Sequence, residues 1–164
     1  MAGKKILYLI LALMVPAVLF VFLKMFGRNE FDVPVLHEEG VVKRFSDCNY
    51  DYAAPYRVAD TVMDALPLNK QDSLYVFYFD DAVRPAMERI PSELRGAPVQ
   101  VISPSAVPSA LDKTLLRQCI LLMQGDTSIA VVDHSRRIRG YYRGSERDEI
   151  DRLIVEMKII LKQY

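Results

Sequence analysis

Apolar and polar residues follow three patterns along this chain, and each pattern predicts a different kind of element. An uncharged apolar run occupies residues 6–23. Short runs rich in β-branched and aromatic residues, typical of strands, recur in the rest of the chain. Toward the C-terminus, apolar residues recur at helical spacing and form one face, made by Ile150, Leu153, Ile154, Met157 and Leu161. Together these patterns predict an apolar leading helix followed by an α/β domain.

The leading run, ILYLILALMVPAVLFVFL, has the length of a membrane span, which needs about 20 apolar residues. Backbone groups in lipid must be satisfied within the segment, so a helix is expected, and Pro16 is tolerated there. Lys4 and Lys5 precede the run, and a very short basic tail favours an N-terminus inside the cell. A cleaved signal peptide is the alternative, but its apolar core is shorter and ends at small residues, whereas this run ends in Leu-Lys-Met-Phe. We therefore expect a single-pass inner-membrane protein whose domain lies in the periplasm.

The remaining chain alternates strand and helix patterns. Residues 73–79 (SLYVFYF) are apolar on both faces, as in a central strand covered on both sides. Further strands are expected at residues 41–45, 97–102, 127–133 and 138–143, and helices at residues 58–66, 81–94 and 109–123. Ser145, with Asp148 three residues later, predicts a capping box that opens the last helix.

This order predicts a thioredoxin-like α/β fold, in which helices flank a mixed sheet that ends in an antiparallel hairpin. We expect a membrane anchor over residues 1–26, a linker over residues 27–40 and one domain over residues 41–164.

Composition and motifs exclude several functions. The formal net charge of +0 gives no electrostatic reason to expect a nucleic-acid partner. Two cysteines and two histidines are too few and too dispersed for a self-contained zinc site, so no metal or cofactor is expected. The chain has no Gly-rich phosphate loop, no G-x-S-x-G and no H-E-x-x-H motif. The chain therefore carries no signature of these phosphate-binding, hydrolase and metalloprotease sites.

The C-terminal stretch VVDHSRRIRGYYRGSERDEIDRLIVEMKIILKQY resembles the end of Sco (SenC) proteins, as LKMFGRNEFDVPVLHEEG resembles their anchor-to-domain junction. The resemblance implies a membrane-anchored, thioredoxin-like protein that acts in cytochrome c oxidase assembly by delivering copper or reducing thiols. In that family, copper and redox chemistry depend on a C-P-x-x-C-P motif after the first central strand and on a distant histidine.

This chain departs from the family at its chemical centre. Aligning Pro85 with the second proline of the motif places Asp80 and Arg84 at the two cysteine positions. The histidine would fall near Gly125 or Asp126, where none is present. Copper(I) prefers thiolates, so the family's metal site is not carried over. Asp80 or Asp81 is expected to cap the following helix, and Asp80 and Arg84, four residues apart, to form a surface ion pair. The alternative is a protein-docking patch made by these charges.

The remaining candidates are dispersed. Cys48 lies in a polar loop and Cys119 in an apolar helix, and the sequence leaves open whether they form a disulfide, stay as thiols or rebuild a site. His37 is expected in a solvated turn. Basic side chains of the hairpin region suggest either a solvated surface or an acidic or lipid partner: Arg136, Arg137, Arg139, Arg143 and Arg147.

The sequence therefore predicts an anchored, Sco-like protein without catalysis that binds respiratory oxidase subunits or their assembly factors. The alternative is a copper carrier or thiol-disulfide oxidoreductase that uses Cys48 or Cys119.

Overall fold

The computed structural model describes residues 2–26, 32–42, 48, 50 and 52–162. It divides into two compact units, Met1–Asp32 and Val33–Tyr164, each considered by itself below. The second unit thus begins inside the segment that the sequence assigned to a linker. We call residues 33–40, which lead into the sheet, the entry segment.

The first unit contains helix α1, Ala2–Phe26, with Pro16 inside it. Large apolar side chains along this helix are exposed, among them Tyr8, Leu13 and Phe20. By length and hydropathy taken together, no helix within the described residues qualifies as a membrane crossing.

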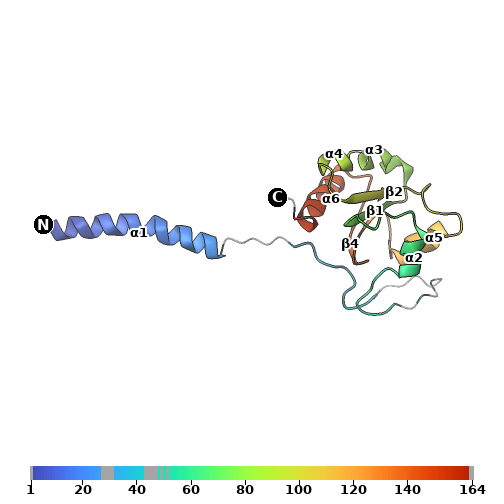
Figure 1. Cartoon of the computed structure of the whole chain (residues 1–164), viewed down its shortest axis with the longest axis horizontal. Coiled ribbons are helices and arrows are strands. Elements are labelled where there is room, and N and C mark those ends of the chain that lie inside the picture. Colours follow the sequence, from blue (N-terminus) through green and yellow to red (C-terminus); the bar gives the residue numbers. More distant parts are fainter. Residues whose placement is uncertain (1, 27–31, 43–47, 49, 51, 163–164) are drawn as a thin grey trace. The chain divides into compact units, whose positions relative to one another are not determined.

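The second unit is built on a four-stranded mixed sheet in the order β2-β1-β3-β4 (Figure 1). Strand β1 (Leu74–Tyr78) is buried at every position and lies between β2 (Val99–Ile102), which is parallel to it, and β3 (Ile129–Asp133), which is antiparallel. Strand β4 (Ile138–Tyr142) returns antiparallel to β3, with a register shift at Val131/Val132. The predicted mixed sheet with a buried central strand and an antiparallel terminal hairpin is confirmed. The parallel pairing expected of strands joined by helices holds for β1 and β2 but not for β3, which runs antiparallel to β1.

Side chains alternate across the strands, so the sheet has two buried faces. We call one the helix-covered face, because α3 (Arg84–Met87), α4 (Ile90–Glu93) and α6 (Arg147–Ile160) pack on it. Its core is apolar and is made by residues that include Leu74, Val76, Ile129, Val131, Met87, Ile90, Leu153 and Met157.

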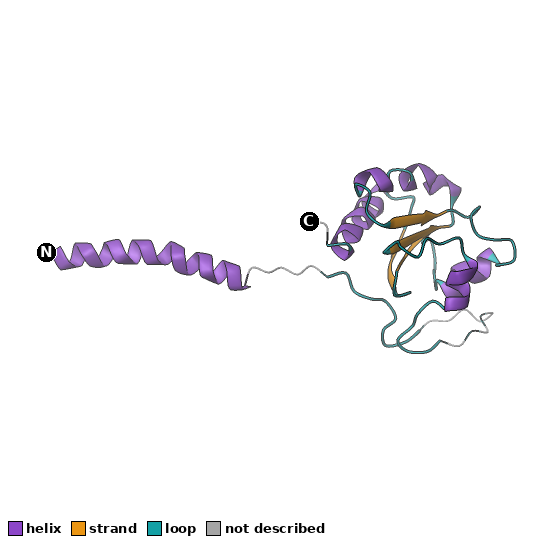
Figure 2. Cartoon of the chain, in the orientation of Figure 1, coloured by secondary structure: helices purple, strands orange, loops and turns teal. Residues whose placement is uncertain are grey.

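The opposite face, which we call the loop-covered face, carries α2 (Asp60–Ala65), α5 (Lys113–Leu115) and the π-helix η2 (Leu116–Ile120), together with long irregular segments (Figures 1 and 2). Its core includes Tyr75, Phe77, Val132 and Ile138 from the sheet. The two faces therefore differ in how the chain covers them.

Several helices differ from the sequence predictions. Residues 81–94 do not form one helix, because the 3-10 turn η1 (Asp81–Val83), α3 and α4 are separate pieces. Pro85 and Pro91 lie at the starts of α3 and α4, where a residue without an amide proton is tolerated but cannot continue a preceding helix. Residues 109–123 contain only the short α5 and η2, since Asp112 caps α5 from outside.

The start of α6 is also different. Glu146, rather than Ser145, is the N-cap residue, and no side chain caps the helix there. The Glu146 amide donates to the Arg143 carbonyl at 3.2 Å, so a turn occupies the predicted cap position and the helix begins later. Helix α2 confirms the helix expected over residues 58–66. The strand expected at residues 41–45 lies largely outside the described residues.

Candidate functional site

The turn after β1 holds the two positions that match the family's cysteines. The Asp80 carboxylate accepts a hydrogen bond from the Ala82 amide at 2.9 Å and thereby caps η1. Arg84 pairs with Asp81 at 2.5 Å, with both side chains exposed. The expected Asp80–Arg84 ion pair is therefore wrong. Asp80 is the N-cap of η1, and its carboxylate binds a backbone amide at the start of that turn. Hydrogen bonding to Asp81 raises the pKa of Arg84, which stays charged.

The loop before β3, where the family's histidine would belong, is closed by backbone and arginine contacts. Arg117 donates to the carbonyls of Gly125 at 3.2 Å and Thr127 at 2.9 Å. The Ser128 carbonyl accepts from the Phe79 amide at 3.0 Å, which joins this loop to the turn after β1. The two segments to which the Sco resemblance assigns a metal centre therefore lie together in this chain, joined by backbone and arginine contacts.

Gly144 completes this junction through its small size. Its amide donates to the Ser128 hydroxyl at 2.9 Å. A Cβ atom on Gly144 would come within 2.2 Å of a Val83 methyl and 2.8 Å of the Ser128 hydroxyl. Any larger residue would push apart the turn after β1 and the loop before β3.

The donor set does not suit copper(I). Asp80 offers hard oxygen atoms that already bond an amide, and Arg84 is a permanent cation. Among the described residues, no three His, Cys, Asp or Glu side chains are grouped so that they would hold a metal ion. We therefore derive no chemistry through a metal.

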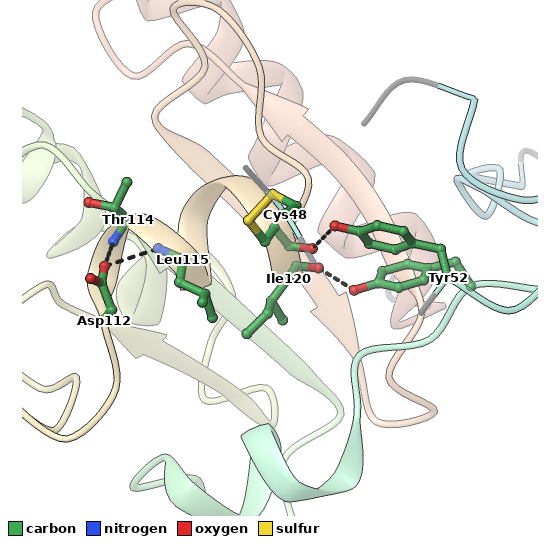
Figure 3. Close-up of a disulfide and its surroundings, with 8 residues drawn as sticks. Cys48, Tyr52, Asp112, Thr114, Leu115 and Ile120 are labelled. Carbon is green, nitrogen blue, oxygen red and sulfur yellow. Dashed lines mark hydrogen bonds between the residues drawn. A yellow bond between two sulfur atoms is a disulfide. The ribbon is translucent and has the colours of Figure 1, made fainter. Parts of the chain in front are cut away.

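The two cysteines meet far from that turn. Cys48 and Cys119 form a disulfide with a Cα–Cα distance of 5.4 Å, linking residues 71 apart in sequence. Of the alternatives that the sequence left open, the structure has the disulfide: Cys119 is buried in η2, and Cys48 is fixed against it. Figure 3 shows the disulfide beside the start of α5, where Asp112 caps the amides of Thr114 at 2.6 Å and Leu115 at 3.1 Å.

Three tyrosine hydroxyls cap the end of η2 on the same face, an arrangement we call the tyrosine clasp. Tyr52 donates to the Cys119 carbonyl at 2.9 Å, Tyr56 to the Ile120 carbonyl at 2.6 Å, and Tyr141 to the Leu121 carbonyl at 2.8 Å (Figure 3 shows the first two). The last carbonyls of a helix lack partners within it, so buried ones need donors from elsewhere. Burial also raises the pKa of Tyr56 and of Tyr141, which keeps both hydroxyls protonated as donors.

His37 lies in a turn over residues 36–39, as expected, but its side chain is half-buried rather than solvated. Its Nε2 atom lies 3.1 Å from the Tyr141 hydroxyl, and its ring centroid lies 6.3 Å from that of Tyr56. Burial lowers the pKa of His37. Sequence reasoning missed both His37 and the clasp, although the signal was present: tyrosines at positions 50, 52 and 56 follow Cys48 closely in a segment without helix or strand period.

The basic hairpin cluster is largely engaged within the domain. Arg137 and Arg139 both contact Asp133, whose side chain is 3% exposed, at 2.8 and 3.3 Å. Arg136 pairs with Asp60 at 3.1 Å, and Arg143 with Glu146 at 3.1 Å. Arg139 also donates to the Val33 carbonyl at 2.5 Å. These contacts support the structural interpretation of the cluster over a binding surface for acidic partners or lipids.

Comparisons with protein-family models, with curated proteins and with solved structures find no match to this chain.

Proposed function

We propose that this chain is a membrane-anchored, Sco-like protein whose thioredoxin-like domain binds a partner during respiratory oxidase assembly without catalysis. The observation that carries the proposal is the turn after β1. It lies where α/β folds place their functional clefts, and its residues are used for capping and ion pairing rather than for thiol or metal chemistry.

Two further features support a Sco-like, thioredoxin-like assignment. The order β2-β1-β3-β4, with β2 parallel to β1 and a closing β3–β4 hairpin before the last helix, is the order expected of a thioredoxin-like domain. The I-R-G-Y-Y stretch that resembles the family forms β4, and the Gly-Ser turn after it leads into α6.

The membrane anchor rests on the sequence of residues 6–23, which is uncharged and preceded by two lysines. A phosphatase fused after Tyr164 should be active only in the periplasm, and the full chain should resist carbonate extraction. Activity of the fusion in the cytoplasm would overturn this orientation.

The partner-binding role is tested by charge reversal at the turn. Arg84→Glu removes the exposed ion pair with Asp81, and Arg89→Glu is a matched control, because Arg89 pairs with Glu93 at 3.3 Å and is 50% exposed against 53% for Arg84. In a strain lacking this chain, wild type and Arg89→Glu should restore assembled oxidase, measured by haem absorbance and oxygen uptake, and Arg84→Glu should not. Equal restoration by both variants would remove the turn from the binding surface.

The alternative, a copper carrier or thiol-disulfide oxidoreductase that uses Cys48 or Cys119, is separated by copper(I) titration and by a reductase assay with a model disulfide, with thiol counting as the check on the cysteines. Because both sulfurs are in one disulfide, the protein unfolded without reductant should show no reactive thiol, and two after reduction. Stoichiometric, tight copper(I) binding that is lost in Cys48→Ser would instead establish the carrier. Reductase activity that is lost in Cys48→Ser would establish the oxidoreductase.

A further inference from the structure

His37 lies where three parts of the loop-covered face meet. The adjacent Leu36 amide donates to the Ile138 carbonyl of β4 at 2.9 Å. The His37 carbonyl accepts from the Tyr56 amide at 3.0 Å and from the Gly40 amide at 3.2 Å. Its ring then reaches Tyr141, whose hydroxyl binds η2. Leu36 and His37 together therefore join the entry segment to the sheet, to the Tyr56 segment and to the tyrosine clasp.

The hydrogen-bond geometry fixes the proton on the ring. A backbone carbonyl only accepts, so Tyr141 must donate its one proton to Leu121. Toward His37 the same hydroxyl acts as an acceptor, and Nε2 must therefore carry a proton. Neutral His37 is thus the Nε2–H tautomer, and any second proton binds at Nδ1 and charges the ring.

We propose that His37 is an acid-sensitive pin: protonation of its ring loosens the entry segment from β4 and from the Tyr56 segment. The neutral ring fits a half-buried place between two phenols, and the charged ring is less well hydrated there than in free solution.

The surroundings offer little to balance such a charge. Among the described residues, the groups that face the ring from the packed segments are the phenols of Tyr56 and Tyr141, and burial raises the pKa of both, so they stay neutral. Their ring centroids lie 6.3 and 6.2 Å away, at the outer limit for attraction between a cation and an aromatic face. On its own turn, Glu38 and Glu39 are exposed to water. Burial accordingly lowers the pKa of His37.

The backbone conformation of His37 makes this residue the place where the entry segment detaches when the ring is protonated. His37 has a φ of 61°, a left-handed conformation that a residue with a side chain holds only when its surroundings fix it. When the ring leaves its place, that conformation loses its support, and the Leu36 and Tyr56 amides are the first hydrogen bonds to open. The domain then stays folded while its entry segment moves, and this release does not depend on the partner proposed above.

The test is hydrogen exchange of the full chain in mild detergent at pH 7.5 and pH 5.0, followed at the Leu36 and Tyr56 amides and corrected for the intrinsic rate. His37→Gln is the matched variant, since its amide group still donates to Tyr141 but does not titrate. Wild-type protection at both amides should fall at least about twofold more than in His37→Gln between the two pH values. The Val131 amide in the core should show no such difference.

An equal pH dependence in wild type and His37→Gln would overturn the proposal. A loss of protection spread evenly to Val131 would also overturn it, because the whole domain, rather than the entry segment, would then respond to acid. Circular dichroism of His37→Gln at pH 7.5 should match wild type, so that a folding defect is recognised before the comparison is made.

Discussion

The two faces of the sheet are stabilised in different ways. On the helix-covered face, apolar side chains of α4 and α6 pack on β1 and β3, and the helices satisfy their own backbone groups. On the loop-covered face, the carbonyls at the end of the π-helix η2 are satisfied by tyrosine hydroxyls, and a disulfide links distant segments. Where short helices and irregular segments cover a sheet, specific polar and covalent contacts must supply the hydrogen bonds that a longer helix would make within itself.

The largest expected effect is on the loop-covered face. Replacing both cysteines by serine releases a crosslink between residues 71 apart, which should lower the free energy of unfolding by about 4 kcal/mol. Denaturant unfolding of the full chain measures this loss. Reduced wild-type protein is the control and should lose a similar amount. A change below about 1 kcal/mol would mean that packing alone holds this face together.

On the helix-covered face, the greatest loss should come from an apolar side chain. Leu153 is completely buried, and Leu153→Ala should cost about 3 kcal/mol through lost contacts and the cavity left behind. Val155→Ala, on the same helix but 55% exposed, is the control and should change the free energy of unfolding by less than about 0.5 kcal/mol. Similar losses in both variants would show that helix formation, rather than packing, is being measured.

A tyrosine pair compares the faces directly. Tyr56→Phe removes the donor to the buried Ile120 carbonyl and should cost about 1–2 kcal/mol. Tyr142→Phe removes a 2.6 Å hydrogen bond to Glu156. The Glu156 carboxylate still has its ion pair with Arg152 and is accessible to water, so the loss in free energy of unfolding should be only about 0.5–1 kcal/mol. Thermal or denaturant unfolding measures both. If Tyr142→Phe is the more costly variant, the proposed contrast between the faces is wrong.

The smallest expected effect is the pH dependence from His37. Its pKa in the folded state lies below the usual 6.5, so the unfolded chain binds the proton more readily. The free energy of unfolding should therefore be highest above pH 6.5 and should fall as the pH drops from 6.5 through the lowered pKa. His37→Gln should flatten this part of the profile.

The same contrast explains what the sequence could predict. Strand β1 and helix α6 have strong periodicity, and the structure places both as expected, because their apolar faces determine how they pack. Helix boundaries at Pro91 and Glu146 were not predicted, since they depend on turns that local patterns describe poorly.

The candidate site was only partly predictable, for a different reason. That Asp80 acts as a cap, one of the possibilities for an acid at a helix start, follows from local chemistry. The Cys48–Cys119 disulfide and the Tyr141–His37 contact join residues 71 and 104 apart, and no local pattern encodes such meetings. The contacts that hold the loop-covered face together can therefore be recognised only in the folded structure, and not from the sequence.

The entry segment has a consequence for how this domain behaves beside other copies of itself. An unpaired outer strand invites pairing with a strand of another chain, which is a route to aggregation. Along β4 the entry segment obstructs that route. The Leu36 amide already donates to the Ile138 carbonyl, and the Arg139 side chain donates to the Val33 carbonyl. The opposite edge, β2, is only four residues long. Losing the entry segment would therefore expose the edge of β4, and we expect the domain to associate edge to edge more readily even with its core intact.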